Sequence, residues 1–346
     1  MQDVAIIGAS GYGGGELLRW LAVHPQARVA LATSRTHAGK PVSAAFPGLA
    51  GRMDLTLAAE AAPDQMARCA VVFLARDNGA AMDMAPGLLA AGCRVVDLSA
   101  DFRFRDPAHY EAWYGAAHRS PQLTRGAAYG MPELHRDAIR VARVVGNPGC
   151  YTSASILALA PLVEAGLVEL DSIVVDGKSG LSGAGRSKFG LDYHFAEANE
   201  SVWAYKIAGT HRHTPEIEQE LSALAGQSVT ISFTPCVVPM TRGILASAYA
   251  RLSEYRSADA LRELYRAFYR DAPFVWVSDD LPATKHTLGS NMCHIGLGVD
   301  ARTNRVTVLA ALDNLGKGMA GQAVQNMNLM CGWDETAGLG APPLWP

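Results

Sequence analysis

The sequence lacks any excess of positive charge. Its 30 lysines and arginines are outnumbered by 33 aspartates and glutamates, which gives a formal net charge of -3. No lysine and arginine cluster alternates with aromatic residues, as a nucleic-acid-binding surface would require. These absences argue against nucleic acid as a partner and favour chemistry on a small molecule.

Long apolar segments are also missing. The start, MQDVAIIGAS, enters a short apolar stretch without the basic residues, long apolar region and cleavage site of a secretory signal. The most apolar helical stretch is interrupted by Pro161, Glu164 and Glu169, so it is too short and too charged to cross a bilayer. We therefore expect a cytoplasmic protein with no membrane partner.

The third absence is a paired CxxC motif. Six scattered cysteines fit neither a disulfide framework nor a cysteine-rich zinc site, so we expect no metal and mostly small buried thiols. The six are Cys69, Cys93, Cys150, Cys236, Cys293 and Cys331.

The first part of the chain alternates short apolar runs typical of strands with helical runs. Strands that are apolar on both faces and joined by helices predict an α/β domain with a parallel, doubly wound sheet. The expected strands are 4–8, 28–33, 69–75, 94–99 and 140–145, and the expected helices are 15–23 and 80–92.

From about residue 150 the pattern changes to an α+β domain. The short link 301–304 predicts an antiparallel hairpin, and a last helical run at 317–332 is expected to return to the first domain. The further expected strands are 229–235, 243–252, 294–300 and 305–312. We therefore predict one domain over 1–149 and 317–346, and a second, with a mostly antiparallel sheet, over 150–316.

A glycine-rich turn follows the first expected strand and opens a helix. Such glycines allow a tight turn and close approach of a pyrophosphate to the helix N-terminus, although similar turns also occur for packing alone. The turn contains Gly8, Ala9, Ser10, Gly11, Tyr12, Gly13 and Gly14. Because no Lys-Ser/Thr pair follows, we expect a Rossmann-type dinucleotide site and not an ATP-binding P-loop.

The second expected strand ends without the acidic residue that commonly holds the ribose of NAD. It ends instead in Ser34 and Arg35. An arginine there suits the 2′-phosphate of NADP, whereas the alternative is a surface arginine with the acidic residue elsewhere. We therefore expect NADP(H) as the cofactor.

One cysteine lies at a constrained corner. In VGNPGCYTSA, Asn147 precedes proline and is biased away from helix, while the residues from Tyr151 onward predict a helix. A free cysteine titrates near ~8.5, but the N–H groups and dipole of a helix N-terminus favour the thiolate. Cys150 is therefore a candidate nucleophile; the alternative is a buried cysteine at a helix start.

Two histidines in AGTHRHTPEI provide candidates for proton transfer. Thr214 is expected as the N-cap of a following helix with Pro215 at its first position. In an extended segment His211 and His213 point one way and Arg212 the other, and a nearby helix N-terminus favours neutral imidazole. We expect one catalytic and one structural histidine; a zinc site, which lacks a third ligand with metal-like spacing, and two surface histidines are the alternatives.

A glycine and serine loop, DGKSGLSGAGR, lies between the cysteine and the histidines. Its backbone N–H groups and terminal arginine suit a phosphate or carboxylate, and a plain linker is an equally good interpretation. The candidates in this loop are Ser179, Gly180, Ser182, Gly183 and Arg186.

These motifs, in this order and nearly from end to end, resemble the N-acetyl-gamma-glutamyl-phosphate reductase family of arginine biosynthesis. The resemblance rests on GASGYGGGELLR, VDLSADFR, YGMPEL, NPGCYTSA, KSGLSGAGR, AYKIAGTHRHTPEIEQEL, FTPCVVPMTRGIL, GSNMCHIG and LDNLGKGMAGQAVQNMNL. It implies the fold of aspartate-semialdehyde and phosphorylating glyceraldehyde-3-phosphate dehydrogenases, and a homo-oligomer, either dimeric or tetrameric.

The resemblance further implies an NADPH-dependent reduction of N-acetyl-glutamyl 5-phosphate to the 5-semialdehyde with release of phosphate. It makes Cys150 the acyl-accepting nucleophile and His211 the general acid/base, and it brings the segment of Asn314 and Lys317 to the cofactor. Backbone N–H groups at the corner and the Asn147 amide are candidates for oxyanion binding, and Arg212 is a further substrate-binding candidate.

The sequence departs from the family pattern at three places. It has Tyr-Thr-Ser where Tyr-Pro-Thr is expected after the cysteine, Arg-Asp-Asn-Gly at 76–79 where Leu-Pro-His-Gly is expected, and Met-Thr for Met-Asn before Arg242. The second departure concerns the cofactor side. A related reductase of carrier-bound aminoadipyl phosphate in lysine biosynthesis, and a non-catalytic NADP-binding sensor, remain the alternative functions.

Overall fold

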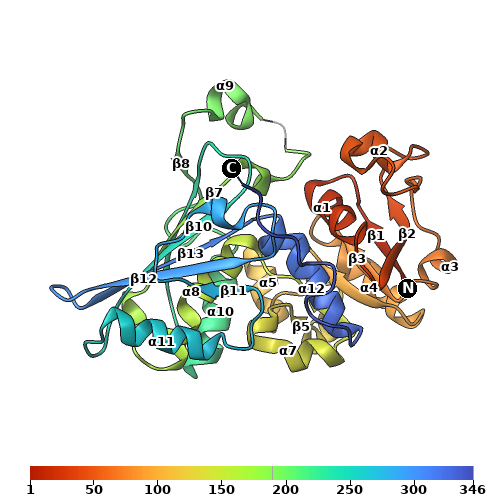
Figure 1. The fold of residues 1–346 in the computed structure, drawn as a ribbon. Helices are drawn as coiled ribbons and strands as arrows, with labels where there is room; N and C mark the ends of the chain where they lie inside the picture. The colour runs from red at the N-terminus through yellow and green to blue at the C-terminus, as the bar shows by residue number, and fades with distance from the viewer. Residues whose placement is uncertain (189, 346) are drawn as a thin grey trace. The chain divides into compact units, whose positions relative to one another are not determined.

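The chain forms two compact units in a computed structural model that describes residues 1–188 and 190–345 (Figure 1). Unit 1 comprises Met1–Pro148, Gly185–Ser187 and Met319–Ala341, and unit 2 comprises Gly149–Ala184, Lys188–Gly318 and the residues from Pro342. The chain passes from unit 1 to unit 2 between Pro148 and Gly149, one residue before Cys150.

Unit 1 contains a six-stranded sheet in the order β2-β1-β3-β4-β6-β5. Each neighbouring pair in it is parallel, as the alternation of strands and helices predicts. Its strands are β1 (Gln2–Ile7), β2 (Ala27–Thr33), β3 (Val71–Leu74), β4 (Arg94–Asp97), β5 (Ala128–Tyr129) and β6 (Val144–Gly146). The prediction of a parallel sheet is therefore confirmed.

The helices of unit 1 cover a sheet that is apolar on both faces. Helix α4 packs on Ala5, Ile7, Val72 and Leu74, which alternate with Val4, Ile6, Val71 and Phe73 on the opposite face. The helices are α1 (Tyr12–Leu21), α2 (Val42–Ala45), α3 (Pro63–Met66), α4 (Ala80–Ala90), α5 (Pro107–Tyr114), α6 (Pro121–Gly126), α7 (Pro132–Val141) and α12 (Gly321–Met330), with the 3-10 turn η1 (Pro47–Leu49). The last helix returns to α1, α7 and β4, as expected.

Unit 2 contains a mixed seven-stranded sheet in the order β11-β12-β13-β10-β7-β9-β8. Its pairs are antiparallel except β11 with β12 and β7 with β9, and β12 and β13 form the predicted hairpin. The strands are β7 (Val174–Ser179), β8 (Trp203–Ala204), β9 (Ser232–Val237), β10 (Ile244–Arg251), β11 (Val275–Val277), β12 (Cys293–Asp300) and β13 (Arg305–Leu312).

The centre of unit 2 is the helix that begins at the candidate nucleophile. Helix α8 (Cys150–Glu164) is buried from Tyr151 to Val163 and packs on β7, β10 and β13, and on α10 and α11. The other helical segments are α9 (Phe195–Ala198), α10 (Thr214–Ala225), α11 (Ala258–Phe268), η2 (Leu170–Ser172), η3 (Leu181–Ala184), η4 (Leu191–Tyr193) and η5 (Thr284–Thr287). A π-helical turn, η6 (Gly316–Ala320), precedes α12.

Two local expectations are corrected. The helix after the glycine turn begins at Tyr12 and not at Gly15. Arg140 and Val141 end helix α7, so the strand before the cysteine begins only at Val144. Among residues 1–188 and 190–345, no helix is long and apolar enough to span a lipid bilayer.

Candidate active site

The glycine turn of unit 1 requires its glycines. Gly8 has φ +93°, and a Cβ there would lie 2.3 Å from the carbonyl oxygen of Ala75. A Cβ on Gly14 would lie 2.6 Å from the Cα of Ala9. Gly11 is the N-cap of α1, and in the described part of the chain no side-chain hydrogen bond caps this helix. This geometry fits a dinucleotide pyrophosphate.

The end of β2 is bonded to the glycine turn. Thr33 accepts hydrogen bonds from the N–H groups of Gly8 (3.1 Å, to Oγ1) and Ala9 (2.7 Å, to the carbonyl). The Ser34 hydroxyl donates to Oγ of Ser10 at 2.8 Å, and Arg35 is exposed immediately beyond it. The two segments expected to bind NADP therefore lie together in unit 1.

Arg186 and Gly185 also belong to unit 1, although the loop up to Ala184 belongs to unit 2. Its Nη1 donates to the carbonyl oxygens of Ser10 and Ala45, each at 3.2 Å, and its guanidinium lies 4.9 Å from the centre of the Phe46 ring. The sequence grouped this arginine with the substrate-side loop. Its contacts place it beside the glycine turn of the cofactor segment.

The cysteine corner is held by the first turn of α10. Helix α8 begins at Cys150, as predicted, with Gly149 as its extended N-cap. The N–H of Gly149 donates to Oε1 of Glu216 at 2.9 Å, and a Cβ on Gly149 would lie 2.4 Å from Nε2 of His213. Glycine at this position thus allows the His213 ring to lie directly beside the corner. Glu216 was not identified from the sequence. The one feature of the sequence that could have indicated it is its place as a glutamate in the first helical turn after the histidines.

The two histidines lie in a turn and not in an extended segment. His213 has helical backbone angles and is itself the N-cap of α10, so the expected N-cap role of Thr214 is wrong. The rings of His211 and His213 have centroids 4.7 Å apart, and the N–H of His213 donates to Nδ1 of His211 at 3.1 Å. Arg212, between them, is exposed.

His211 is enclosed by aromatic rings. It is only 7% exposed, and Tyr151, Tyr205 and Phe233 contact it with ring centroids 5.8, 5.4 and 5.3 Å away. Burial lowers the pKa of His211 to about 2, and the charge of neighbouring His213 adds to this effect. The imidazole is therefore neutral near pH 7, but mainly because of burial and not because of the helix.

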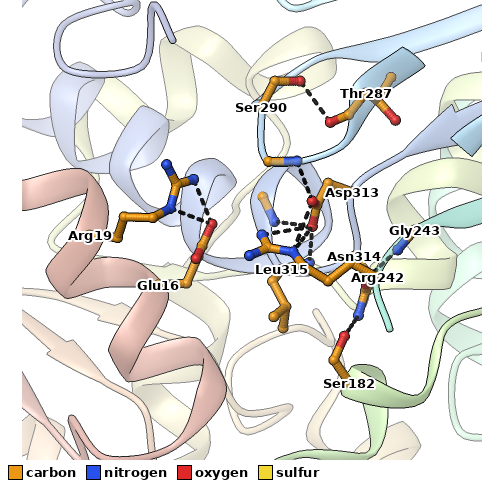
Figure 2. A network of polar contacts seen from close by, with 12 residues as sticks. Glu16, Arg19, Ser182, Arg242, Gly243, Thr287, Ser290, Asp313, Asn314 and Leu315 are labelled. Carbon is orange, nitrogen blue, oxygen red and sulfur yellow. Dashed lines mark hydrogen bonds and ion pairs between the residues drawn. The ribbon is translucent and has the colours of Figure 1, made fainter. Parts of the chain in front are cut away.

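A polar network in unit 2 holds the serine and glycine loop (Figure 2). Asn314 donates to Oγ of Ser182 at 2.9 Å and accepts from the N–H of Gly243 at 2.8 Å. The adjoining Asp313, fully buried, accepts from Nε and Nη2 of Arg242 and from the N–H of Gly289. The ion pair of Glu16 and Arg19 in the same picture belongs to α1 of unit 1.

Several other candidates belong to unit 2. Ser179 ends β7, and its hydroxyl donates to the carbonyl oxygen of Gly180 at 3.1 Å. Gly183 follows Ser182, and a Cβ there would lie 3.7 Å from Nδ2 of Asn314. Lys317 is fully buried, with its Nζ 5.7 Å from the centre of the Phe274 ring. The expected cofactor candidates are thus divided between the two units.

Asn147 belongs to unit 1 and is buried. Its side chain donates to the carbonyl oxygen of Met319 at 3.0 Å and accepts from Nδ2 of Asn326 at 3.1 Å. Asn78, at one departure from the family pattern, accepts from the N–H of Ala100 at 3.0 Å. Within the part of the chain that the structure describes, no three histidine, cysteine or acidic side chains are grouped as metal ligands.

The chain matches two family models that together span most of its length. Residues 3–142 match the NAD binding domain of semialdehyde dehydrogenase, and residues 150–314 match the semialdehyde dehydrogenase dimerisation domain. The chain is 54% identical over 346 residues to an N-acetyl-gamma-glutamyl-phosphate reductase of Symbiobacterium thermophilum, covering 99% of each protein. It is 50% identical over 349 residues to the reductase of the same name from Geobacter metallireducens, covering 100% of each.

Solved structures of low sequence identity share the fold. Aspartate semialdehyde dehydrogenase II from Vibrio cholerae has a TM-score of 0.73 at 18% identity, with 96% of this chain and 98% of the other covered. Aspartate semialdehyde dehydrogenase with NADP from Candida albicans has a TM-score of 0.70 at 16% identity and the same coverage. At these identities the likeness confirms the predicted fold.

Proposed function

Because the chain belongs to the N-acetyl-gamma-glutamyl-phosphate reductase family, we propose that it reduces N-acetyl-L-glutamyl 5-phosphate to N-acetyl-L-glutamate 5-semialdehyde in arginine biosynthesis. The reaction consumes NADPH and releases phosphate. The observation that carries the proposal is the cysteine at the N-terminus of α8, with two histidines at the start of α10 and one of them against Gly149. We propose the cytoplasm as its location.

Cys150 is the proposed nucleophile. The N-terminal end of α8 carries partial positive charge, which favours the thiolate over the thiol. The thiolate attacks the acyl carbon, a C–S bond forms, and the bond to the phosphate oxygen breaks, so that phosphate leaves and a thioester remains. N–H groups at the start of α8, including that of Cys150, are suited to stabilise the oxyanion that precedes this thioester.

His211 and His213 are the candidates for proton transfer, and their surroundings favour different roles. His213 is partly exposed and lies against Gly149, which precedes the nucleophile. The aromatic enclosure of His211 keeps its imidazole neutral and in place. We propose that His213 protonates the oxygen of the thiohemiacetal and accepts this proton again when the C–S bond breaks. His211, which the family resemblance makes the general acid/base, then has the role of orienting His213.

The cofactor residues are proposed from the fit of unit 1 to a dinucleotide. The N–H groups at the start of α1 would hold the pyrophosphate, and Ser34 and Arg35 the 2′-phosphate. NADPH supplies the hydride that reduces the thioester. Arg186, bonded to Ser10, adds positive charge beside the glycine turn. Ser182, Gly183, Asn314 and Lys317 remain candidates for the nicotinamide side.

Each unit has a proposed role. Unit 1, with the match to an NAD binding domain, binds NADP(H); unit 2, with the match to a dimerisation domain, carries the chemistry and the contacts between subunits. We propose a homo-oligomer, a dimer or a tetramer. The candidates for substrate or oxyanion binding remain Ser179, Gly180 and Arg212 of unit 2, and Asn147 and Arg186 of unit 1.

The reverse reaction tests the proposal. Native protein mixed with N-acetyl-glutamate semialdehyde, phosphate and NADP should form NADPH, followed by absorbance. Cys150→Ala should lower the rate at least about 10³-fold because it removes the covalent step. Cys236→Ala, which alters another partly exposed cysteine of unit 2, should retain activity. A native protein without activity on this semialdehyde, but active on carrier-bound aminoadipyl semialdehyde, would favour the lysine-pathway alternative.

A further inference from the structure

Asn147 is held at each of its polar groups by unit 1. It lies three residues before Cys150, and its contacts come from two motifs, VDLSADFR and the C-terminal helical run. Its N–H donates to the Asp97 carbonyl at 2.8 Å, its carbonyl accepts from Nε of Arg103 at 2.7 Å, its Nδ2 donates to the Met319 carbonyl at 3.0 Å, and its Oδ1 accepts from Asn326 at 3.1 Å.

Asn326 determines how the Asn147 amide is oriented. It is fully buried on α12, and its Nδ2 donates both to Oδ1 of Asn147 and to the carbonyl oxygen of Gly130, at 2.9 Å. A carboxamide has two N–H donors, so both are used. Because Oδ1 of Asn147 accepts from Asn326, Nδ2 of Asn147 must face Met319. A Cβ on Gly130 would lie 2.5 Å from Nδ2 of Asn326, which explains why glycine is needed there.

The arrangement is not the one that packing alone favours. Oδ1 of Asn326 is buried and has no hydrogen-bond partner within residues 1–188 and 190–345. A buried, unsatisfied carbonyl oxygen destabilises the folded state, so the residue requires another explanation. Oε1 of Gln322 on the same helix is also buried without a partner among the described residues, so the contact with Asn147 is what distinguishes Asn326. Gln322 donates to the same Gly130 carbonyl at 2.7 Å, and Asn328 bonds to His24, Glu335 and Ala337.

The corner transmits the position of Asn147 to the nucleophile. Pro148 has a fixed φ, and the Gly149 N–H is bonded to Glu216, so few backbone torsions separate Asn147 from the start of α8. A displacement of Asn147 as a whole would therefore be passed along the chain to the N–H groups and the thiol at Cys150. An error of about 1 Å in such a group can reduce a rate about 10²-fold.

We propose that Asn326 is a positioning residue that fixes Asn147 and, through it, the Cys150 corner. The role rests on the proposed function, because it assumes Cys150 as nucleophile. It gives the C-terminal helix a part in the chemistry without contact with the substrate.

The test compares Asn326→Ala with Gln322→Ala and Asn328→Ala, which alter the same helix but not the contact with Asn147. Two quantities are measured: steady-state kinetics, and the rate at which iodoacetamide alkylates Cys150, followed by peptide mass spectrometry without cofactor or substrate. Asn326→Ala should lower kcat about ten- to hundred-fold with an unchanged KM for NADPH, and should alter the alkylation rate. The control variants should lower thermal stability while leaving kcat and alkylation near the native values.

A double variant makes the test specific. If Asn326 acts through Asn147, Asn326→Ala should change neither kcat nor alkylation further in an Asn147→Ala background. Full additivity, or an equal loss of kcat in Gln322→Ala, would overturn the proposal. If the Asn326→Ala protein does not fold, Asn326→Ser is measured in its place. An altered alkylation rate in a protein without reductase activity would retain the positioning role but reject the proposed function.

Discussion

At the scale of single residues, the two histidines at the start of α10 differ in what surrounds them. His211 lies among Tyr151, Tyr205 and Phe233, and burial lowers its pKa to about 2. His213 lies against Gly149 and keeps contact with solvent. A group that does not titrate near neutral pH cannot produce a limb of the pH–rate profile there. His211 is therefore not expected to produce such a limb.

Replacement of each histidine separates these roles. His213→Asn should lower kcat about 10²- to 10⁴-fold and remove a limb of the pH–rate profile, because it removes the proton-transfer group. His211→Asn should preserve the shape of the profile and mainly lower the thermal unfolding temperature, since it removes ring contacts from the aromatic enclosure. Kinetics from about pH 5 to 9 check both. If His211→Asn instead removed the limb, the assignment that follows from the family resemblance would be supported.

Some residues could be predicted from the sequence because local rules fix them. The start of α8 at Cys150 follows from a strand, Asn-Pro, glycine and an apolar helix, all adjacent in the chain. Glu216 and Arg186 could not be assigned in this way. Their contacts with Gly149 and Ser10 join residues 67 and 176 positions apart, which no local pattern reports.

At the scale of elements, the β1–α1 turn is defined by steric limits. Gly8 combines a left-handed φ of +93° with a Cβ position 2.3 Å from the Ala75 carbonyl oxygen on the turn after β3. Gly92, after α4, has a similar φ of +90° but no neighbouring atom within 4 Å of its Cβ position. A comparison of Gly8 with Gly92 therefore distinguishes the cost of a left-handed backbone from the cost of a steric clash.

The two glycines should therefore respond differently to alanine. Gly92→Ala should lower the free energy of unfolding by about 1–2 kcal/mol, the cost of a left-handed alanine. Gly8→Ala should cost about 1–3 kcal/mol more because β1 and β3 must separate, and it should raise KM for NADPH. Urea denaturation and NADPH kinetics measure these effects. Equal losses of stability and an unchanged KM would contradict the account of this turn.

Element types were easier to predict than element ends. The parallel strands of unit 1 and the β12–β13 hairpin follow from apolar runs and short links. The start of β6 and the N-cap of α10 were wrong because Arg140 and Val141 continue α7, and because His213, not Thr214, caps the turn. Both errors concern helix ends, which fray and which local patterns locate less well than the helix itself.

At the scale of the whole molecule, the proposed site residues come from segments far apart in the chain. Unit 1 is completed by α12, which begins more than 170 residues after β6. Periodicity alone could indicate that this helix returns to the first domain, but not that Asn326 bonds to Asn147. The family match over the full length covers both units. In the proposed reaction, unit 1 binds the cofactor and unit 2 carries the nucleophile.

The central claim is that Cys150 carries the acyl group between phosphate and hydride transfer. Native protein mixed rapidly with N-acetyl-glutamate semialdehyde and NADP, without phosphate, should form about one equivalent of NADPH per subunit in a burst. Intact-protein and peptide mass spectrometry of the quenched mixture should then find the N-acetyl-glutamyl group on Cys150. An acyl group on another residue, or a burst that persists in Cys150→Ala, would contradict the account.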